Sequence, residues 1–151
     1  PLRIEDDRLA VIEGIQDGTI DAIASDHRAR SKDTKAQPFS AASVGASGIE
    51  TLFLMTLELV HEKIIDLNKA ISLLTINPAN VLNMHKPSLE KNKQADFIIF
   101  DENCPDVIKQ NNLKTSPSPF DCRKVKGKVL GTFINGKAAH INQILEDKII
   151  K

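Results

Sequence analysis

One short segment of the sequence brings together side chains that could perform acid–base, metal-binding and anion-binding chemistry. It reads SDHRAR at residues 25–30 and follows the apolar run AIA. A carboxylate at the end of a buried run is unfavourable unless it has a partner, and functional acids often occupy such places. Asp26 is therefore a candidate catalytic acid, with the capping of a strand end as the alternative role.

His27 is a second candidate because imidazole is a common metal ligand. Successive side chains of a strand point to opposite faces, so His27 and Asp26 cannot easily reach one metal ion together. We expect His27 to support the segment through a hydrogen bond instead.

The sequence around this segment predicts the elements that position it. Apolar residues at helical spacing, with acids in the first turn, predict a helix over residues 4–17. Residues 19–25 predict a buried strand, and residues 26–47 a loop too long for a simple connector. Strand, loop and helix in this order are typical of parallel α/β folds, whose active sites lie at the carboxyl ends of the strands. Asp26 occupies that position.

Three further helices are predicted after the loop. Residues 48–63 are apolar on most sides and should form a largely buried helix. Asp66 should cap a helix over residues 67–75. Asn77 should cap another over residues 78–85, with Pro78 at its first position.

Strand signals dominate beyond residue 88. Residues 95–103 predict a strand that ends in a turn, and residues 124–142 a hairpin with Asn135-Gly136 at its turn. We expect three parts: an α/β part at 1–87, a β-rich part at 88–142, and a tail at 143–151 that is either a short helix or loose.

The bulk composition narrows the function classes. The 151 residues include 20 basic and 20 acidic side chains, so the formal net charge is zero. This balance argues against a nucleic-acid-binding surface, and no apolar run reaches the length of a membrane span. Cys104 and Cys122 form neither a metal-binding spacing nor a disulfide framework, which favours a reduced, cytoplasmic setting. The chain starts at Pro1 and enters a helix at once, so we expect a fragment of a longer polypeptide.

Six stretches, taken together, resemble the C-terminal part of the dihydroorotases, within the amidohydrolase superfamily. They are PLR before an acidic helix, DGTIDAIASDH, GIET, INPANVL, ADFIIFD and SPFDCRKVKGKVLGTFINGK. No single stretch is decisive, but six in the right order and spacing are a strong signal. The related hydantoinases and allantoinases share several of them.

The resemblance implies an α/β fold class: the C-terminal part of a metal-dependent hydrolase (β/α)8 TIM barrel, plus the C-terminal strands of a small β-sandwich domain. Residues 19–25 would be the last barrel strand. The first seven strands would lie outside this sequence, together with the His-x-His pair, the bridging lysine or acid, and two later histidines of the zinc site. This chain alone would then hold an incomplete site for one or two zinc ions.

The resemblance further implies that Asp26 touches the metal and acts as acid and base on a cyclic amide. Zinc lowers the pKa of its bound water to about 7, and a nearby carboxylate can pass the water's proton to the departing ring nitrogen. The substrates would be N-carbamoyl-L-aspartate and dihydroorotate of pyrimidine biosynthesis.

Arg30 stands where the family has a histidine that helps to bind the substrate carboxylate, and a guanidinium group can bind a carboxylate through two parallel hydrogen bonds. Arg28 could do so instead, or both could be solvated loop charges.

The family also places a Phe-Gly pair shortly before Gly-x-Glu-Thr, where backbone groups meet the substrate. Counting back from Gly48 puts Val44 and Gly45 there, whereas residue type would select Phe39-Ser40. We favour Gly45, because a close backbone approach suits glycine. The alternative is a flexible loop with incidental glycines.

The remaining histidines, at positions 61, 85 and 140, are expected to be structural or solvated.

The partners that the resemblance implies are the small-molecule substrate, the rest of the same protein, a second copy in a homodimer, and aspartate transcarbamoylase. Two other functions stay open. One is a non-catalytic dihydroorotase-like subunit that scaffolds aspartate transcarbamoylase, and the other is an allantoinase or hydantoinase.

Overall fold

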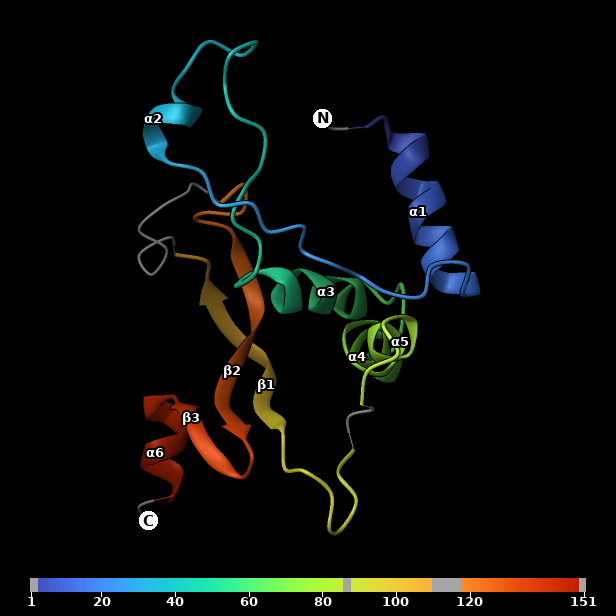
Figure 1. Cartoon of the computed structure of the whole chain (residues 1–151), viewed down its shortest axis with the longest axis vertical. Coiled ribbons are helices and arrows are strands. Elements are labelled where there is room, and N and C mark those ends of the chain that lie inside the picture. Colours follow the sequence, from blue (N-terminus) through green and yellow to red (C-terminus); the bar gives the residue numbers. More distant parts are fainter. Residues whose placement is uncertain (1–2, 86–87, 110–117, 150–151) are drawn as a thin grey trace.

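A computed structural model of the chain describes residues 3–85, 88–109 and 118–149, with helices in the first half and a small sheet in the second (Figure 1). The helices are α1 (Glu5–Asp17), α2 (Lys32–Lys35), α3 (Leu52–His61), α4 (Leu67–Leu74), α5 (Ile76–Val81) and α6 (Gln143–Ile149). The strands are β1 (Phe97–Val107), β2 (Lys124–Ile134) and β3 (Lys137–Ile141). Helix α3 lies centrally, with the sheet on one side and α4 and α5 on the other. None of the described helices is long and apolar enough to cross a membrane.

The sheet is antiparallel with strand order β1-β2-β3. The predicted hairpin is confirmed, because Asn135 and Gly136 join β2 to β3 with positive φ angles of 51° and 72°. Two positive angles are what a two-residue hairpin turn requires. Phe97 and Phe133, which are paired across β1 and β2, stack with ring centroids 4.6 Å apart.

Strand β1 continues beyond its predicted end to Val107, because the predicted turn is a bulge within the strand. The amides of Asn103 and Cys104 donate to the Asp101 carboxylate at 2.9 and 3.1 Å. Pairing with β2 resumes at Pro105. An Asp whose carboxylate accepts hydrogen bonds from the next backbone amides gives the same sequence signal at a turn that ends a strand and at a bulge within one. The sequence alone could not tell the two apart.

Helix α3 rests directly on β2 at Gly127, opposite this bulge. Gly127 has φ 127°, and a Cβ there would lie 2.6 Å from Leu57 Cδ1 and 3.2 Å from Leu54 Cδ2. On the same helix, Phe53 meets Phe100 of β1 edge to face, with ring centroids 5.0 Å apart. The predicted helix is therefore confirmed over a shorter span than 48–63, but it is half-buried rather than largely buried, with Thr56 and Leu57 as its buried residues.

The helical half has its own core, formed by Ile15, Ile65, Ala70 and Leu73. Asp66 caps α4 as predicted, since its carboxylate accepts the Lys69 amide at 2.7 Å.

The predicted cap at Asn77 is wrong. The chain re-enters a helix immediately after α4, so Thr75 occupies the N-cap position of α5 and Asn77 lies inside the helix. Helix α5 also ends at Val81, short of the predicted residue 85.

The predicted strand at residues 19–25 is also wrong. This segment crosses above α3 without regular secondary structure (Figure 1). Within the part of the chain that the structure describes, residues 20–25 donate two backbone hydrogen bonds, from Ile20 to Gly14 at 2.8 Å and from Ile23 to Leu73 at 3.1 Å. A strand exists only when another pairs with it, and no described residue supplies a partner strand. Ile20 and Ile23 still pack against the helical core, as the apolar run suggested.

The predicted loop at 26–47 contains one helical turn, α2, and the predicted tail is helical over α6. Some predictions reach residues outside the described ranges: the first two letters of PLR, the boundary at residue 87, and the final two residues of the tail.

Candidate functional site

Asp26 lies where the 20–25 segment leaves the helical core and the long loop begins. Its backbone is in the left-handed region, with φ 42°. Asp is one of the few residues other than glycine that tolerates this region. The side chain is 82% exposed, and Oδ1 lies 3.3 Å from Nε of Arg28. The chain therefore turns sharply at Asp26 and presents its carboxylate to solvent beside one cation.

His27 connects the start of the loop to its end through hydrogen bonds. Its Nδ1 accepts hydrogen bonds from the backbone amides of Gly48 and Ile49, at 3.2 and 3.3 Å. The predicted supporting role is confirmed. A nitrogen that accepts such bonds has its lone pair engaged, so the proton of the neutral ring lies on Nε2. Neither nitrogen then offers a free lone pair to a metal ion.

The loop folds back on itself, so that its first arm, around Arg28, touches its second arm at Gly45. The Arg28 amide donates to the Ala46 carbonyl at 3.0 Å. Gly45 has φ 117°, and a Cβ there would lie 2.8 Å from both Cβ and the carbonyl oxygen of Arg28. The structure thus shows a close approach at Gly45 to the opposite arm of the loop, whereas the predicted approach was to a substrate.

Two basic side chains hold the second arm through its carbonyls. Arg30 Nε donates to the Val44 carbonyl at 3.0 Å, and Lys35 Nζ donates to the carbonyls of Ser43 and Gly45 at 3.1 and 3.0 Å. The Val44 side chain itself is exposed. Sequence reasoning missed Lys35, because a lysine that bonds distant carbonyls leaves no pattern in the sequence.

At this loop the exposed carboxylate of Asp26 offers oxygens of a type that zinc accepts as ligands. The structurally described residues contain no group of three or more His, Cys, Asp or Glu side chains arranged to hold a metal. The donor set therefore fits a zinc site that takes one ligand from this chain and the others from elsewhere.

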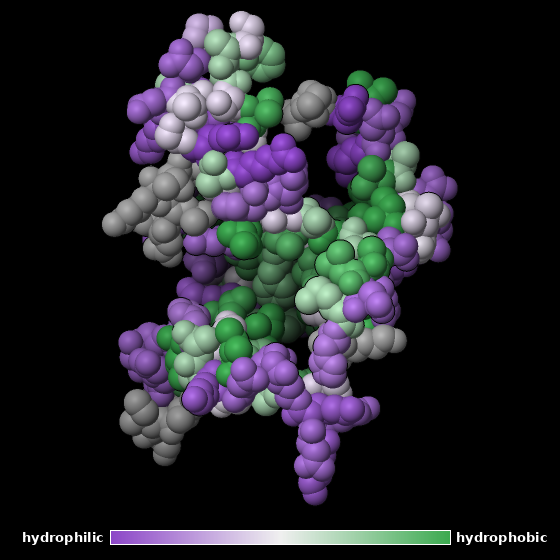
Figure 2. All heavy atoms as spheres, viewed as in Figure 1, coloured by the Kyte–Doolittle hydropathy of each residue, from purple (hydrophilic) through white to green (hydrophobic). Residues whose placement is uncertain are grey.

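An apolar recess adjoins the base of the loop. It is a pocket of about 420 Å³ between α1, the 20–25 segment and α3. Figure 2 shows hydrophobic side chains gathered in the hollow centre of this face, with polar side chains on the loop above. Its lining side chains include Val11, Ile15, Ile20, Ile23, Leu52 and Met55. Val11 is exposed and most of the other lining residues are half-buried, whereas Ile15 is buried in the helical core.

Comparison with known proteins identifies the family. The model of the amidohydrolase family matches residues 2–139, and the chain belongs to this family. Among curated relatives, it is 40% identical over 142 residues to a dihydroorotase of Wolbachia sp. subsp. Drosophila simulans, covering 93% of this chain and 32% of the relative. It is 41% identical over 143 residues to a dihydroorotase of Ehrlichia canis, again covering 93% and 32%. The chain thus spans about a third of the length of these relatives.

Solved structures agree on the fold. The structure of a D-hydantoinase is 26% identical, with a TM-score of 0.81 over 91% of this chain and 32% of that one. The crystal structure of dihydropyrimidinase from Brevibacillus agri is 21% identical, with a TM-score of 0.84 over 95% of this chain and 33% of that one. The arrangement of helices and sheet described above is therefore shared with these enzymes.

Proposed function

We propose that the chain is the C-terminal part of a zinc-dependent cyclic amide hydrolase, a dihydroorotase of pyrimidine biosynthesis. The identity of 40% to a dihydroorotase over 93% of the chain supports this substrate. One observation supports the role of Asp26. Its backbone has φ 42° and its carboxylate is exposed, at the start of a loop whose ends are held together at His27 and Gly45.

In this proposal Asp26 is both a zinc ligand and the residue that moves the proton. When zinc is bound, it supplies a water with a pKa lowered to about 7 and stabilises negative charge on the attacked carbonyl oxygen. Asp26 takes the proton of the attacking water and delivers it to the ring nitrogen that leaves. Arg30 binds the substrate carboxylate, with Arg28 as the alternative, and the backbone at Val44 and Gly45 contacts the ring.

We also propose that the rest of the same protein covers the apolar recess. It would complete a (β/α)8 barrel in which the segment at residues 20–25, which is not a strand in this structure, becomes the last strand by pairing with the companion. The rest of residues 1–87 would contribute the closing helices, residues 88–142 part of the sandwich, and residues 143–151 a tail. The match to 32% of the relatives' length supports a missing companion of this kind. The assembled protein would be a cytoplasmic homodimer.

The test is reconstitution. The chain is produced together with a companion, the part of the Ehrlichia canis dihydroorotase that the chain does not match, and supplied with zinc. We expect dihydroorotate to be opened to carbamoyl aspartate only when both pieces are present. Asp26→Asn should lower kcat by about 10²–10⁴-fold while the two pieces still associate.

Other results would point elsewhere. A reconstituted, zinc-loaded complex that opens hydantoin or allantoin in preference to dihydroorotate would indicate the hydantoinase or allantoinase alternative. A complex that is inactive on all three, yet binds aspartate transcarbamoylase, would indicate the scaffolding alternative. Full activity of the Asp26→Asn complex would contradict the role assigned to Asp26.

A further inference from the structure

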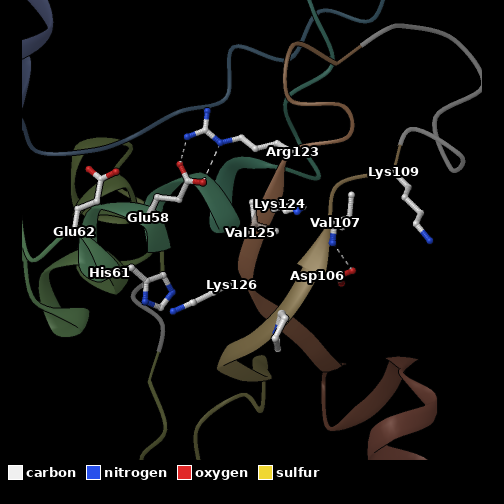
Figure 3. A pocket seen from close by; sticks show the side chains of 11 residues that line it. Glu58, His61, Glu62, Asp106, Val107, Lys109, Arg123, Lys124, Val125 and Lys126 are labelled. Atoms are coloured by element: carbon white, nitrogen blue, oxygen red, sulfur yellow. Dashed lines mark hydrogen bonds and ion pairs between the residues drawn. The ribbon is translucent and has the colours of Figure 1, made fainter.

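A second pocket lies between the C-terminal half of α3 and the paired ends of β1 and β2 (Figure 3). Its volume is about 650 Å³, within the range of roughly 300–1,000 Å³ that small-molecule sites occupy. Residues from the loop at 26–47 take no part in its lining. The lining comprises Glu58 and His61 of α3 with Glu62 just after it, residues 105–107 and Lys109, and Arg123 with residues 124–126 of β2.

The acidic side chains of this pocket are mostly neutralised or turned away. Glu58 is bound by Arg123 through two bonds, from Nη2 at 2.6 Å and from Nε at 3.0 Å. Asp106 lies 3.1 Å from Nζ of Lys128. Glu62 points away from the strands (Figure 3). Little negative charge is therefore left free at the strand side of the pocket.

Two lysines on that side have no such partner. Lys124 and Lys126 lie roughly 7 Å apart along β2. The Lys126 side chain extends toward His61, and the Lys124 side chain extends to the other side of the strand (Figure 3). Neither side chain forms an ion pair or hydrogen bond with any residue in the described ranges. Uncompensated cations in a concave site attract anions.

His61 faces Lys126 across the pocket, as their side chains point toward one another (Figure 3). Its Nε2 is buried and has no hydrogen-bond partner among the described residues. A buried polar atom without a partner is unfavourable. An acceptor that entered between His61 and Lys126 would satisfy it after a small rotation of the ring.

The floor of the pocket is apolar. Pro105 and Val107, which pair with Lys126 and Lys124 across the two strands, line the pocket, and Val107 is 39% exposed. We propose that this pocket binds a small organic phosphate, with the phosphate between Lys126 and His61 and the apolar part of the ligand against Pro105 and Val107. Ammonium groups form charge-assisted hydrogen bonds to phosphate oxygens, which are stronger than neutral ones. The inference is independent of the proposed hydrolase activity, because none of these residues belongs to that site.

The test is a titration of the ¹⁵N-labelled 151-residue chain with adenosine 5′-monophosphate, followed through the backbone amide signals of Val107, Val125 and Lys126. Adenosine and inorganic phosphate are titrated separately, so that the contributions of ring and phosphate are distinguished. We expect saturable shifts at these amides with a Kd of about 1 mM or tighter. Adenosine should bind at least tenfold more weakly than the monophosphate.

Variants make the test specific. Lys126→Ala should weaken binding about tenfold or more, and Lys126→Arg, which keeps the charge, should retain most of it. The matched control is Lys137→Ala, which removes an exposed lysine of the same sheet from β3, outside the pocket. The proposal is overturned if 10 mM monophosphate leaves the three amides unshifted, or if Lys126→Ala and Lys137→Ala weaken binding equally.

Discussion

Gly45 determines how closely the two arms of the loop around Asp26 approach one another. Its φ of 117° is a conformation that side-chain-bearing residues rarely adopt, and its Cα faces Arg28 with no room for a methyl group. The hydrogen bond from the Arg28 amide to Ala46 depends on this approach. The position of Asp26, two residues from Arg28, therefore depends on a residue on the far arm of the loop.

Gly45→Ala should open the loop without unfolding the helices. Strained backbone conformations cost about 1–3 kcal/mol, and the clash with Arg28 adds to that cost. Hydrogen exchange of the Arg28 amide should become about tenfold faster or more, at 1.4 kcal/mol per factor of ten. The measurement is amide exchange by NMR or mass spectrometry.

The control is Gly18→Ala. Gly18 also has a positive φ, of 90°, but a Cβ there would meet nothing within 4 Å. This variant should leave exchange at Arg28 unchanged. Faster exchange at Arg28 in both variants would show that closure of the loop does not depend on Gly45.

At this residue scale the sequence predicted the side chains better than their contacts. The end of an apolar run predicted a role for Asp26, which stays a proposal. The supporting role of His27 is present, although the strand alternation from which it was inferred is absent. The contacts of Arg30 and Lys35 are with carbonyls ten or more residues away in most cases. Such contacts depend on how the loop folds back. Because every residue has a backbone carbonyl, the sequence does not show which carbonyl a basic side chain will bind.

At the scale of elements, the contact between α3 and β2 joins the helical half to the sheet. Gly127→Ala would place a methyl group 2.6 Å from Leu57 on a backbone with φ 127°. Overpacking costs about 1–3 kcal/mol and the strained conformation a similar amount, so we expect a loss of about 2–6 kcal/mol in the free energy of unfolding. Urea denaturation measures it.

Gly136→Ala is the matched variant for strain alone. Gly136 has φ 72°, and a Cβ there would lie 3.8 Å from Ala95, an ordinary contact. It should therefore destabilise the chain less than Gly127→Ala. An equal loss in the two variants would mean that the packing of α3 on the strand contributes nothing beyond backbone conformation.

The ion pair between Asp106 and Lys128 gives the sheet a pH dependence. Burial alone would raise the pKa of the Asp106 carboxyl, but the Val107 amide and Lys128 together outweigh burial, and the pKa lies below its usual value. The folded state therefore holds this proton less tightly than the unfolded state. The stabilisation is present above the unfolded pKa of about 3.9 and is lost as the pH falls through the folded pKa.

Asp106→Asn should accordingly lower the urea midpoint at pH 7, and the difference from the unmodified chain should shrink as the pH falls from about 5 to about 2. A difference that stays constant over this range would show that Asp106 acts through something other than its charge. Lys128→Met, which removes the same ion pair from the other side, should reproduce the pH trend.

Local signals predicted the elements whose stabilising contacts are local. The Asn135-Gly136 turn, the Asp66 cap and the apolar face of α3 are each visible within a few residues, and each is confirmed. The strand at 19–25 was wrong because strand pairing is supplied by other segments. The cap at Asn77 was wrong because α4 and α5 follow one another directly, which no local signal revealed.

At the scale of the whole molecule, the described part of the chain leaves apolar surface open at the recess beside α1 and α3. An environment-sensitive dye such as ANS should bind the isolated chain and fluoresce severalfold more brightly than free dye. Addition of the companion used for reconstitution should displace it. Met55→Glu should lower the signal of the isolated chain, since Met55 lines the recess. Unchanged fluorescence on formation of the two-piece complex would mean that the companion covers a different surface.

The segment at residues 20–25 has a further consequence for the chain on its own. It combines apolar side chains with backbone amides at Asp21, Ala22, Ala24 and Ser25 that no described residue accepts. Unpaired backbone of this kind is a template for pairing between molecules. Solubility should thus depend on concentration: a dilute chain stays dispersed, while a concentrated one aggregates by strand addition. Synthesis together with a companion, rather than later mixing, is then the condition under which this segment pairs correctly.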